Sequence, residues 1–412
     1  MIKNFLILVG GTAFAQALSI LAAPLLTRLF SLSDFGILGS ILAVSAIISV
    51  LGSMKYDMAI VLGEDNKEAS SIQFLSIIIS SFLTITFILF FIVAPDYLYE
   101  KINLEFNVFW LVAFFFFTSF NNIFSYRLNR EEMYKNLSFS NIIKRLIIVI
   151  SQIIFGYFGF GAMGLIIGNI FGLISSTLYL YVYNIDFLRY KNDYFNYQYL
   201  KKIAYKYRQF PIYTVPQTML NTFIIQLPVI FLGLFYGVQV VGAYFLTVKI
   251  IQLPTNLLSQ SVRRVFFKEA TKNKNSIHNL KKIYNKITLS LLAVIIIPSI
   301  LLFMYSEPIF TYVFGDDWLL SGKFAKYMIL WFGSVFIMSP TRILFIVLNK
   351  QSLLLILDTV LGIMRLIVLS IAYYGYTPVY IISMYSLLSC LFYLSTMFGW
   401  QIYFYKKNIA NT

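Results

Sequence analysis

About 12 long apolar segments fill most of this chain and limit what it can fold into. The segments cover approximately residues 5–29, 36–62, 70–93, 107–128, 140–159, 162–184, 210–235, 238–262, 285–306, 325–348, 352–374 and 377–404. A helix of about 20 mostly apolar residues can cross a bilayer. With 12% charged residues, the chain has far fewer charges than the roughly 25% of soluble domains. The sequence therefore predicts an all-α integral membrane protein of about 12 transmembrane helices.

The N-terminal segment and the two rarest residue types limit which processing and which chemical sites the chain can have. Lys3 and the string Ala15-Gln16-Ala17 resemble a signal peptide, but the apolar run continues to Phe30, which favours an uncleaved first span. Cys390 is the single cysteine, so an internal disulfide is excluded and a small buried side chain is expected. His278 is the single histidine and lies in a predicted loop. Neither a His-based metal site nor a His-containing catalytic dyad can therefore form.

The basic residues of the loops fall almost entirely on one face. With 12 spans the two termini share a face with the even-numbered loops, and the opposite face has only Lys101, Lys323 and Lys326. Loops rich in Lys and Arg stay in the cytoplasm. The sequence therefore predicts a multi-pass protein of the inner-membrane type with both termini cytoplasmic. The net charge of +15 is mostly this orientation signal.

A long cytoplasmic loop divides the spans into six and six. Its segment Tyr199–Arg208 interleaves tyrosines with basic residues, which would suggest nucleic-acid binding in another protein. Here, topology and attraction to anionic lipid explain the same residues, so no nucleic-acid partner is expected. We expect two pseudo-symmetric six-helix bundles, residues 1–185 and 210–412, joined by a cytoplasmic linker at 186–209. Such internal repeats enclose a central cavity in many transporters.

The charges inside the predicted spans are mostly positive. The cations are Arg28, Lys55, Arg127, Lys144, Arg145, Lys249, Arg342 and Arg365, and the carboxylates are Asp57 and Asp358. Arg127, Lys144 and Arg145 lie near the cytoplasmic surface, where long side chains can reach water. Arg28 is close to the outer end of its span, where either a surface or a cavity position is open.

The other four cations lie deeper in their spans. A charge on a lipid-facing helix costs about 2.5–3.5 kcal/mol there, so these side chains are expected to face a hydrated cavity. Asp358 and Arg365 are two helical turns apart on one face, so a structural pair or a shared network is the alternative for both. The remaining surplus of positive charge suits an anionic substrate.

Two spans also carry polar side chains at helical spacing. These are Thr12, Gln16, Ser19 and Thr27 in the first span, and Thr214, Gln217 and Asn221 in the seventh. The seventh span also holds Pro211, Pro216 and Pro228. Proline permits a bend, which makes this helix a candidate moving part. Prolines are also simply commoner in membrane helices, and the sequence leaves both explanations open.

Several short segments resemble Wzx-type O-antigen and capsule flippases. They are Gly11–Arg28, Asp34–Gly36 and Lys55–Val61 in the first half, and Phe210–Tyr213, Pro216–Gln217, Gln226–Pro228, Gly242–Tyr244, Gln252–Pro254 and Val265–Phe267 in the second. Each is degenerate, but their order and spacing cover about the whole chain. The resemblance implies the multidrug/oligosaccharidyl-lipid/polysaccharide exporter fold in a bacterial inner membrane. It also implies a substrate, an undecaprenyl-pyrophosphate-linked oligosaccharide turned over to the periplasmic leaflet.

That substrate assigns roles to the candidate residues. The pyrophosphate would be bound by Arg28, Lys55, Lys249, Arg342 and Arg365, and the sugars by Gln16, Gln217 and Asn221. The polyprenyl tail would stay in membrane lipid, and a polysaccharide polymerase is a further candidate partner. Asp57 or Asp358 would couple a proton or sodium ion, although the membrane potential also favours outward movement of an anion. Alternating access needs no covalent step and no cofactor, so we expect no enzyme activity.

Two other functions stay open. A cation-coupled multidrug exporter could share the fold, but organic cations would favour an acidic cavity. A polysaccharide polymerase or ligase has many spans and uses the same lipid, but such enzymes carry catalytic residues on a large outer loop. The longest outer loop here, approximately residues 307–324, is short and contains no Arg or His.

Overall fold

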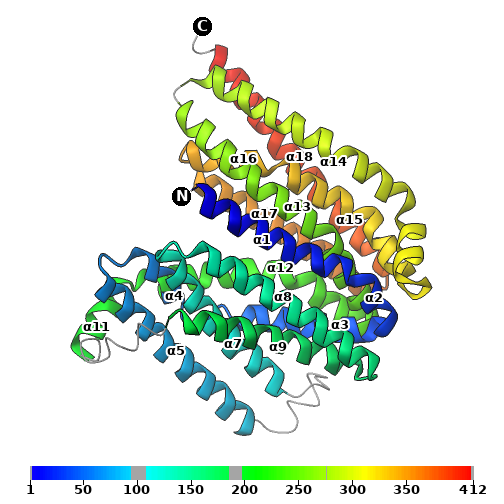
Figure 1. The fold of residues 1–412 in the computed structure, drawn as a ribbon. Helices are drawn as coiled ribbons and strands as arrows, with labels where there is room; N and C mark the ends of the chain where they lie inside the picture. Colours follow the sequence, from blue (N-terminus) through cyan, green and yellow to red (C-terminus); the bar gives the residue numbers. More distant parts are fainter. Residues whose placement is uncertain (1, 94–107, 185–196, 275, 410–412) are drawn as a thin grey trace. The chain divides into compact units, whose positions relative to one another are not determined.

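The structure, a computed structural model, describes residues 2–93, 108–184, 197–274 and 276–409, and these ranges contain helices and no strand. The longer helices are α1 (Ile2–Leu21), α2 (Ala23–Leu29), α3 (Leu32–Ile48), α5 (Asn66–Val93), α7 (Val108–Arg130), α8 (Tyr134–Tyr157), α9 (Gly161–Val182), α11 (Tyr197–Lys206), α12 (Val215–Tyr236), α13 (Val238–Lys272), α14 (Ile277–Phe314), α15 (Leu319–Ile337), α16 (Ser339–Val347), α17 (Gln351–Ser370) and α18 (Pro378–Ile409). In lipid, a spanning backbone has to form its hydrogen bonds within its own segment, which helices do. The predicted all-α membrane class is confirmed (Figure 1).

Most of the predicted spans correspond to long apolar helices. Within the described ranges, nine helices are long and apolar enough to cross a bilayer. Three shorter apolar helices, Ala13–Leu29, Leu32–Ile48 and Val238–Gln252, stand at the places of the first, second and eighth predicted segments. The total of about 12 spans stays a prediction.

Contacts divide the chain into two compact units, Met1–Leu227 (unit 1) and Pro228–Thr412 (unit 2), and each is described by itself. The division falls inside α12, C-terminal to the predicted linker at 186–209. Residues 186–196 of that linker, like Lys101, lie outside the described ranges, whereas α11 forms from its second part. The two six-helix bundles around a cavity stay a prediction.

In unit 1, α1 and α2 run parallel to α8. A Cβ atom on Gly11 would meet Ser138 near the start of α8, and one on Gly156 would meet Phe30 just after α2. The two pairs have nearly the same offset in sequence, so the helices follow one another in the same direction. Glycine also lets α9 approach α8, since a Cβ on Gly172 would lie 2.6 Å from the carbonyl oxygen of Lys144. Small residues at such contacts are typical of membrane helix packing.

In unit 2, α15 is the central helix and contacts α13, α14 and α18. Its side chains are largely buried, including Phe324 and Met328 at 0% exposure. The hydroxyl of Thr247 on α13 donates to the carbonyl oxygen of Ser321 at 3.0 Å, and the Ser321 hydroxyl donates to the Ala243 carbonyl at 3.1 Å. Hydrogen bonds of this kind hold α13 and α15 together in a bilayer, where the hydrophobic effect does not drive helices to associate.

We predict that Gly172→Val destabilises the protein by about 1–3 kcal/mol, because the added carbons overpack the contact of α8 and α9. The obstructing Lys144 oxygen belongs to the backbone and cannot rotate away. Unfolding of the purified protein in detergent measures the effect. Gly10→Val is the matched control, since a Cβ on Gly10 meets no atom within 4 Å. Equal losses in both variants would contradict the close packing of α8 and α9.

Candidate functional site

The second predicted span is interrupted. The helix α3 ends at Ile48, and helical structure resumes with α4 (Tyr56–Ala59) and a 3-10 turn at Ile60–Leu62. Between them Met54 and Lys55 adopt φ values of 50° and 63°, in the left-handed region. For residues with a side chain this conformation costs on the order of 1–3 kcal/mol each and is concentrated at functional sites. The predicted site residue Lys55 therefore lies on a strained break (residues 49–55) and not on a regular helix.

The break lies well inside unit 1. The hydroxyl of Ser80 on α5 donates to the Gly52 carbonyl oxygen at 2.7 Å, and a Cβ on Gly52 would lie 2.0 Å from the Ser119 hydroxyl on α7. Ser80 follows the start of α5 by about 20 Å along the helix axis, and Ser119 precedes the end of α7 by about 16 Å. Non-helical backbone at such depth is tolerated only inside protein or beside a water-filled cavity. The break is thus enclosed by α5 and α7 in unit 1.

Asp57 is the buried carboxylate beside this break. Its side chain is 3% exposed, and the Ser53 hydroxyl donates to Asp57 Oδ1 at 2.7 Å. Lys55 is half-buried, and no cationic nitrogen in the described ranges lies within salt-bridge distance of Asp57. The structure therefore brings the predicted residues Lys55 and Asp57 into one strained segment. Sequence reasoning missed Ser53, although its spacing of four from Asp57 was a usable signal.

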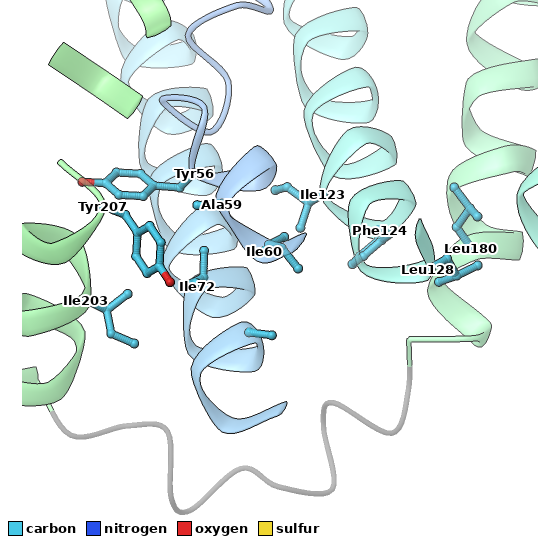
Figure 2. Packing of buried hydrophobic residues seen from close by; sticks show 11 residues of the cluster. Tyr56, Ala59, Ile60, Ile72, Ile123, Phe124, Leu128, Leu180, Ile203 and Tyr207 are labelled. Atoms are coloured by element: carbon cyan, nitrogen blue, oxygen red, sulfur yellow. The ribbon is translucent and has the colours of Figure 1, made fainter. Parts of the chain in front are cut away.

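The helix α11 of the linker packs against the same region. Ile203 and Tyr207 share an apolar cluster with Tyr56 and Ile72, as Figure 2 shows. The Tyr56 hydroxyl also donates to the Ala204 carbonyl oxygen at 3.0 Å. The residue next to Asp57 in sequence is therefore in direct contact with the linker.

Two ion pairs fasten α11 in this position. Lys206 Nζ lies 2.7 Å from Glu64 Oε1 and 2.6 Å from Glu68 Oε1. These hydrogen bonds raise the pKa of Lys206, first through Glu64 and then through Glu68. Glu68 is buried, so its charge depends on this partner more than the charge of the exposed Glu64 does. The predicted linker is thus an ordered helix attached to unit 1.

In unit 2, Arg342 of α16 forms an ion pair with Asp358 of α17. The two side chains are 34% and 41% exposed. The alternative pair of Asp358 with Arg365, expected from their spacing on α17, is wrong. The reason is that a neighbouring helix supplies a cation nearer to the carboxylate than the next turns of α17 do.

Arg365 lies instead in a cage of aromatic side chains. It is 8% exposed, its Nε donates to the Ser389 hydroxyl at 3.0 Å, and its Nη2 donates to the Tyr393 hydroxyl at 3.5 Å. The guanidinium carbon is 4.9 Å from the Trp331 ring centroid and 5.0 Å from that of Tyr385. Cation–π contacts stabilise a guanidinium without neutralising it. No carboxylate of the described chain lies within salt-bridge distance of Arg365.

The cage was missed in the sequence, yet α18 contained a signal for it. Tyr385, Ser389 and Tyr393 follow one another at intervals of four, which places them on one face of a helix. The face holds two phenols and a hydroxyl among apolar residues, and such polar groups in a span need a partner. That partner is Arg365.

The remaining predicted residues are dispersed. Arg28 on α2 and both Gln217 and Asn221 on α12 are exposed, and Lys249 on α13 is half-buried. Gln16 on α1 has a buried carbonyl oxygen, Oε1, with no hydrogen-bond partner. In the ranges that the structure describes, no group of three or more His, Cys, Asp or Glu side chains could hold a metal ion.

Gln16 lies at nearly the same height along the helix axes as Lys144 and Arg145, two cations that the sequence placed near the cytoplasmic surface. The constant offset between α1 and α8 puts Gln16 level with Ile142 and Ile143, just before Lys144 and Arg145. Both cations are half-buried and have no carboxylate within salt-bridge distance in the described chain. Unit 1 therefore holds a buried acceptor on α1 and two cations on α8 at a similar level along the helix axes.

A sequence match identifies the family. Residues 25–323 match the family described as polysaccharide biosynthesis protein. The chain belongs to this family. The match covers well over half of the chain and includes the break, α11 and Lys249, and it ends before Arg342 and Arg365. No curated protein sequence matches the chain.

The chain is similar in fold to solved transporters of the MOP superfamily. An inward-facing multidrug resistance MATE family transporter is 15% identical with a TM-score of 0.70, over 98% of this chain and 96% of that one. Lipid II flippase MurJ, in an inward closed conformation, is 14% identical with a TM-score of 0.74, over 96% and 87%. A MOP superfamily transporter from Pyrococcus furiosus is 14% identical with a TM-score of 0.62, over 98% and 95%. The predicted superfamily fold is confirmed.

We predict that Lys206→Gln releases α11, because Glu64 and Glu68 both lose their ammonium partner. Amide hydrogen exchange in residues 197–206 should become faster, while exchange in the body of α5 stays the same. Lys202→Gln removes an exposed lysine from the same helix that forms no such pair and is the control. Equal exchange in the two variants would mean that the ion pairs do not hold the helix.

Proposed function

We propose that this protein is a flippase for lipid-linked oligosaccharides in the bacterial inner membrane. Its substrate is an undecaprenyl-pyrophosphate-linked O-antigen or capsule repeat unit, moved from the cytoplasmic to the periplasmic leaflet. The observation that supports this proposal most directly is that Arg365 is a buried guanidinium without a carboxylate partner. The chain that contains it belongs to the polysaccharide biosynthesis family. The lipid II flippase MurJ, with a similar fold, supports a lipid-linked substrate.

The chemistry of a pyrophosphate fits this guanidinium. Ser389 and Tyr393 occupy only some of the N–H donors of Arg365, and a guanidinium can bind phosphate oxygens through paired, charge-assisted hydrogen bonds. The aromatic cage holds the planar group in place, which lowers the entropy lost on binding. Arg342, in contrast, is already neutralised by Asp358. Arg365 is therefore the main anion-binding residue of unit 2.

The other predicted residues complete the proposal. Lys55 supplies a second cation at the break, and Gln16, Gln217 and Asn221 offer amide groups to sugar hydroxyls. Transport follows alternating access of two halves, with the polyprenyl tail in lipid and both termini in the cytoplasm. No bond of the substrate is made or broken, so the protein is not an enzyme. A polymerase would use the product on the periplasmic side.

The coupling ion, a proton or sodium ion, acts at Asp57 and not at Asp358. Asp358 is held by Arg342, whereas the structure gives Asp57 only the Ser53 hydroxyl as a side-chain partner. A buried carboxylate without a cationic partner gains most from binding a proton or metal ion. The position of Asp57 beside the strained break links its charge to the backbone that would have to move.

We predict that Asp57→Asn removes the dependence of transport on the ion gradient. Asp358→Asn should lower transport, because it leaves Arg342 without its partner, but should keep the dependence. Transport in proteoliposomes under imposed proton or sodium gradients distinguishes the two. If Asp57→Asn retains its full gradient dependence, Asp57 is not the coupling residue.

A multidrug exporter is the second candidate, because the MATE family transporter has a similar fold. The aromatic cage of unit 2 would suit an organic cation by its ring faces. Those faces are occupied by Arg365, however, and a second cation beside a buried guanidinium would be repelled. The charge of this site therefore favours an anionic substrate.

We predict that Arg365→Gln slows flipping of a pyrophosphate-linked oligosaccharide at least about 10-fold, the loss expected when a hydrogen bond to a charged group is removed. Arg365→Lys keeps the charge without the fork and should retain part of the activity. The assay scores the leaflet of the lipid in proteoliposomes, with unfolding measured in parallel. Lys282→Gln, an exposed lysine of α14, is the control. Full activity of a folded Arg365→Gln variant, or improved export of small organic cations by it, would contradict the flippase assignment.

A further inference from the structure

A groove of about 370 Å³ lies between α17 and α18 of unit 2. Its walls include Leu353 and Leu357 of α17 and Phe392, Trp400 and Tyr403 of α18. These residues extend over about 16 Å along the axis of α18. The groove is therefore a long, mainly apolar track along two helices that are apolar enough to span a membrane.

One end of the groove is cationic. Lys350, which precedes α17, lines the groove, and its Nζ lies 3.9 Å from the Tyr403 ring centroid and 5.5 Å from that of Trp400. Lys407 Nζ lies 5.8 Å from the same Tyr403 ring. Neither lysine has a carboxylate within salt-bridge distance in the described chain. Tryptophan and tyrosine beside lysine are typical of the membrane–water interface.

We propose that this groove binds one anionic phospholipid of the cytoplasmic leaflet. The phosphate lies at Lys350, with Lys407 nearby, and an acyl chain follows Leu353, Leu357 and Phe392 into the membrane. The combination of an apolar track with unpaired positive charge at one end complements an amphiphile with an anionic head. The site is separate from Arg365 and does not depend on the proposed flippase function.

The length of the groove favours a phospholipid over the polyprenyl carrier. Its length of about 16 Å is close to one leaflet of a hydrocarbon core about 30 Å thick. An acyl chain of a membrane phospholipid spans one leaflet, whereas the polyprenyl chain is several times longer. The head end also lies where a helix begins, next to the loop between α16 and α17, as a lipid phosphate at the interface requires.

Gly399 leaves the groove open. It lines the groove on α18, and a Cβ placed on it would meet no atom within 4 Å. Glycine is unfavourable inside a helix. Its presence on the wall of the groove is explained if the groove has to stay open. A side chain at this position would therefore start in open space and extend from a wall of the groove.

The test measures lipid binding to the purified, delipidated protein by native mass spectrometry. The probes are phosphatidylglycerol, phosphatidylcholine and a polyprenyl pyrophosphate. We expect tighter binding of phosphatidylglycerol than of phosphatidylcholine. Lys350→Gln should weaken phosphatidylglycerol binding about 5-fold, the effect of one basic residue near an anionic lipid, and Gly399→Leu should abolish the tight site.

Two control variants match these changes. Lys282→Gln removes an exposed lysine outside the groove, and Gly10→Leu enlarges another helical glycine with open space around it; neither should alter binding. Equal binding of the two phospholipids, or unchanged binding in both Lys350→Gln and Gly399→Leu, would overturn the proposal. Groove-dependent binding of the polyprenyl pyrophosphate that exceeds that of phosphatidylglycerol would overturn the choice of occupant.

Discussion

The hydrogen-bonding demand of the backbone in lipid is the constraint on which this structure depends. Each carbonyl and N–H group that leaves a helix inside the membrane needs another partner. In the break the partners are partly local, with Met54 N–H donating to the Leu51 carbonyl, and partly a side chain of another helix, with Ser80 donating to the Gly52 carbonyl. The break can persist because α5 and α7 enclose it, and this enclosure also buries Asp57.

The same scarcity of water decides how each charge is accommodated. Arg342 and Asp358 neutralise each other across two helices. Arg365 is surrounded by aromatic faces and hydroxyl groups that leave its charge intact. The first arrangement reduces the attraction to a ligand, while the second preserves it. Two arginines that the sequence made equivalent therefore differ in what they can bind.

The sequence predicted the elements that depend on hydropathy and missed those that depend on neighbours. Apolar length alone predicts most of the helices. The break was missed because Met54 and Lys55 are unusual residues for a left-handed conformation, and because Gly52 and Ser53 stand within a continuous apolar run. The spacing of Asp358 and Arg365 places both on one face of α17. The true partner of Asp358, Arg342 on α16, cannot be deduced from the sequence of α17 alone. The spacing of Tyr385, Ser389 and Tyr393 indicates a polar face on α18, but Trp331 and Arg365 come from other helices and cannot be deduced from it.

The linker connects the break to α12, the helix whose prolines make it a candidate moving part. After α11 the backbone forms a π-helical turn at Phe210–Thr214, which includes Pro211, and then enters α12. π-Helical turns mark functional sites in many helices. This turn also contacts α4, the helix that carries Asp57. A displacement of the start of α12 would therefore act on α4 through this turn and on the ion pairs of Lys206 through α11.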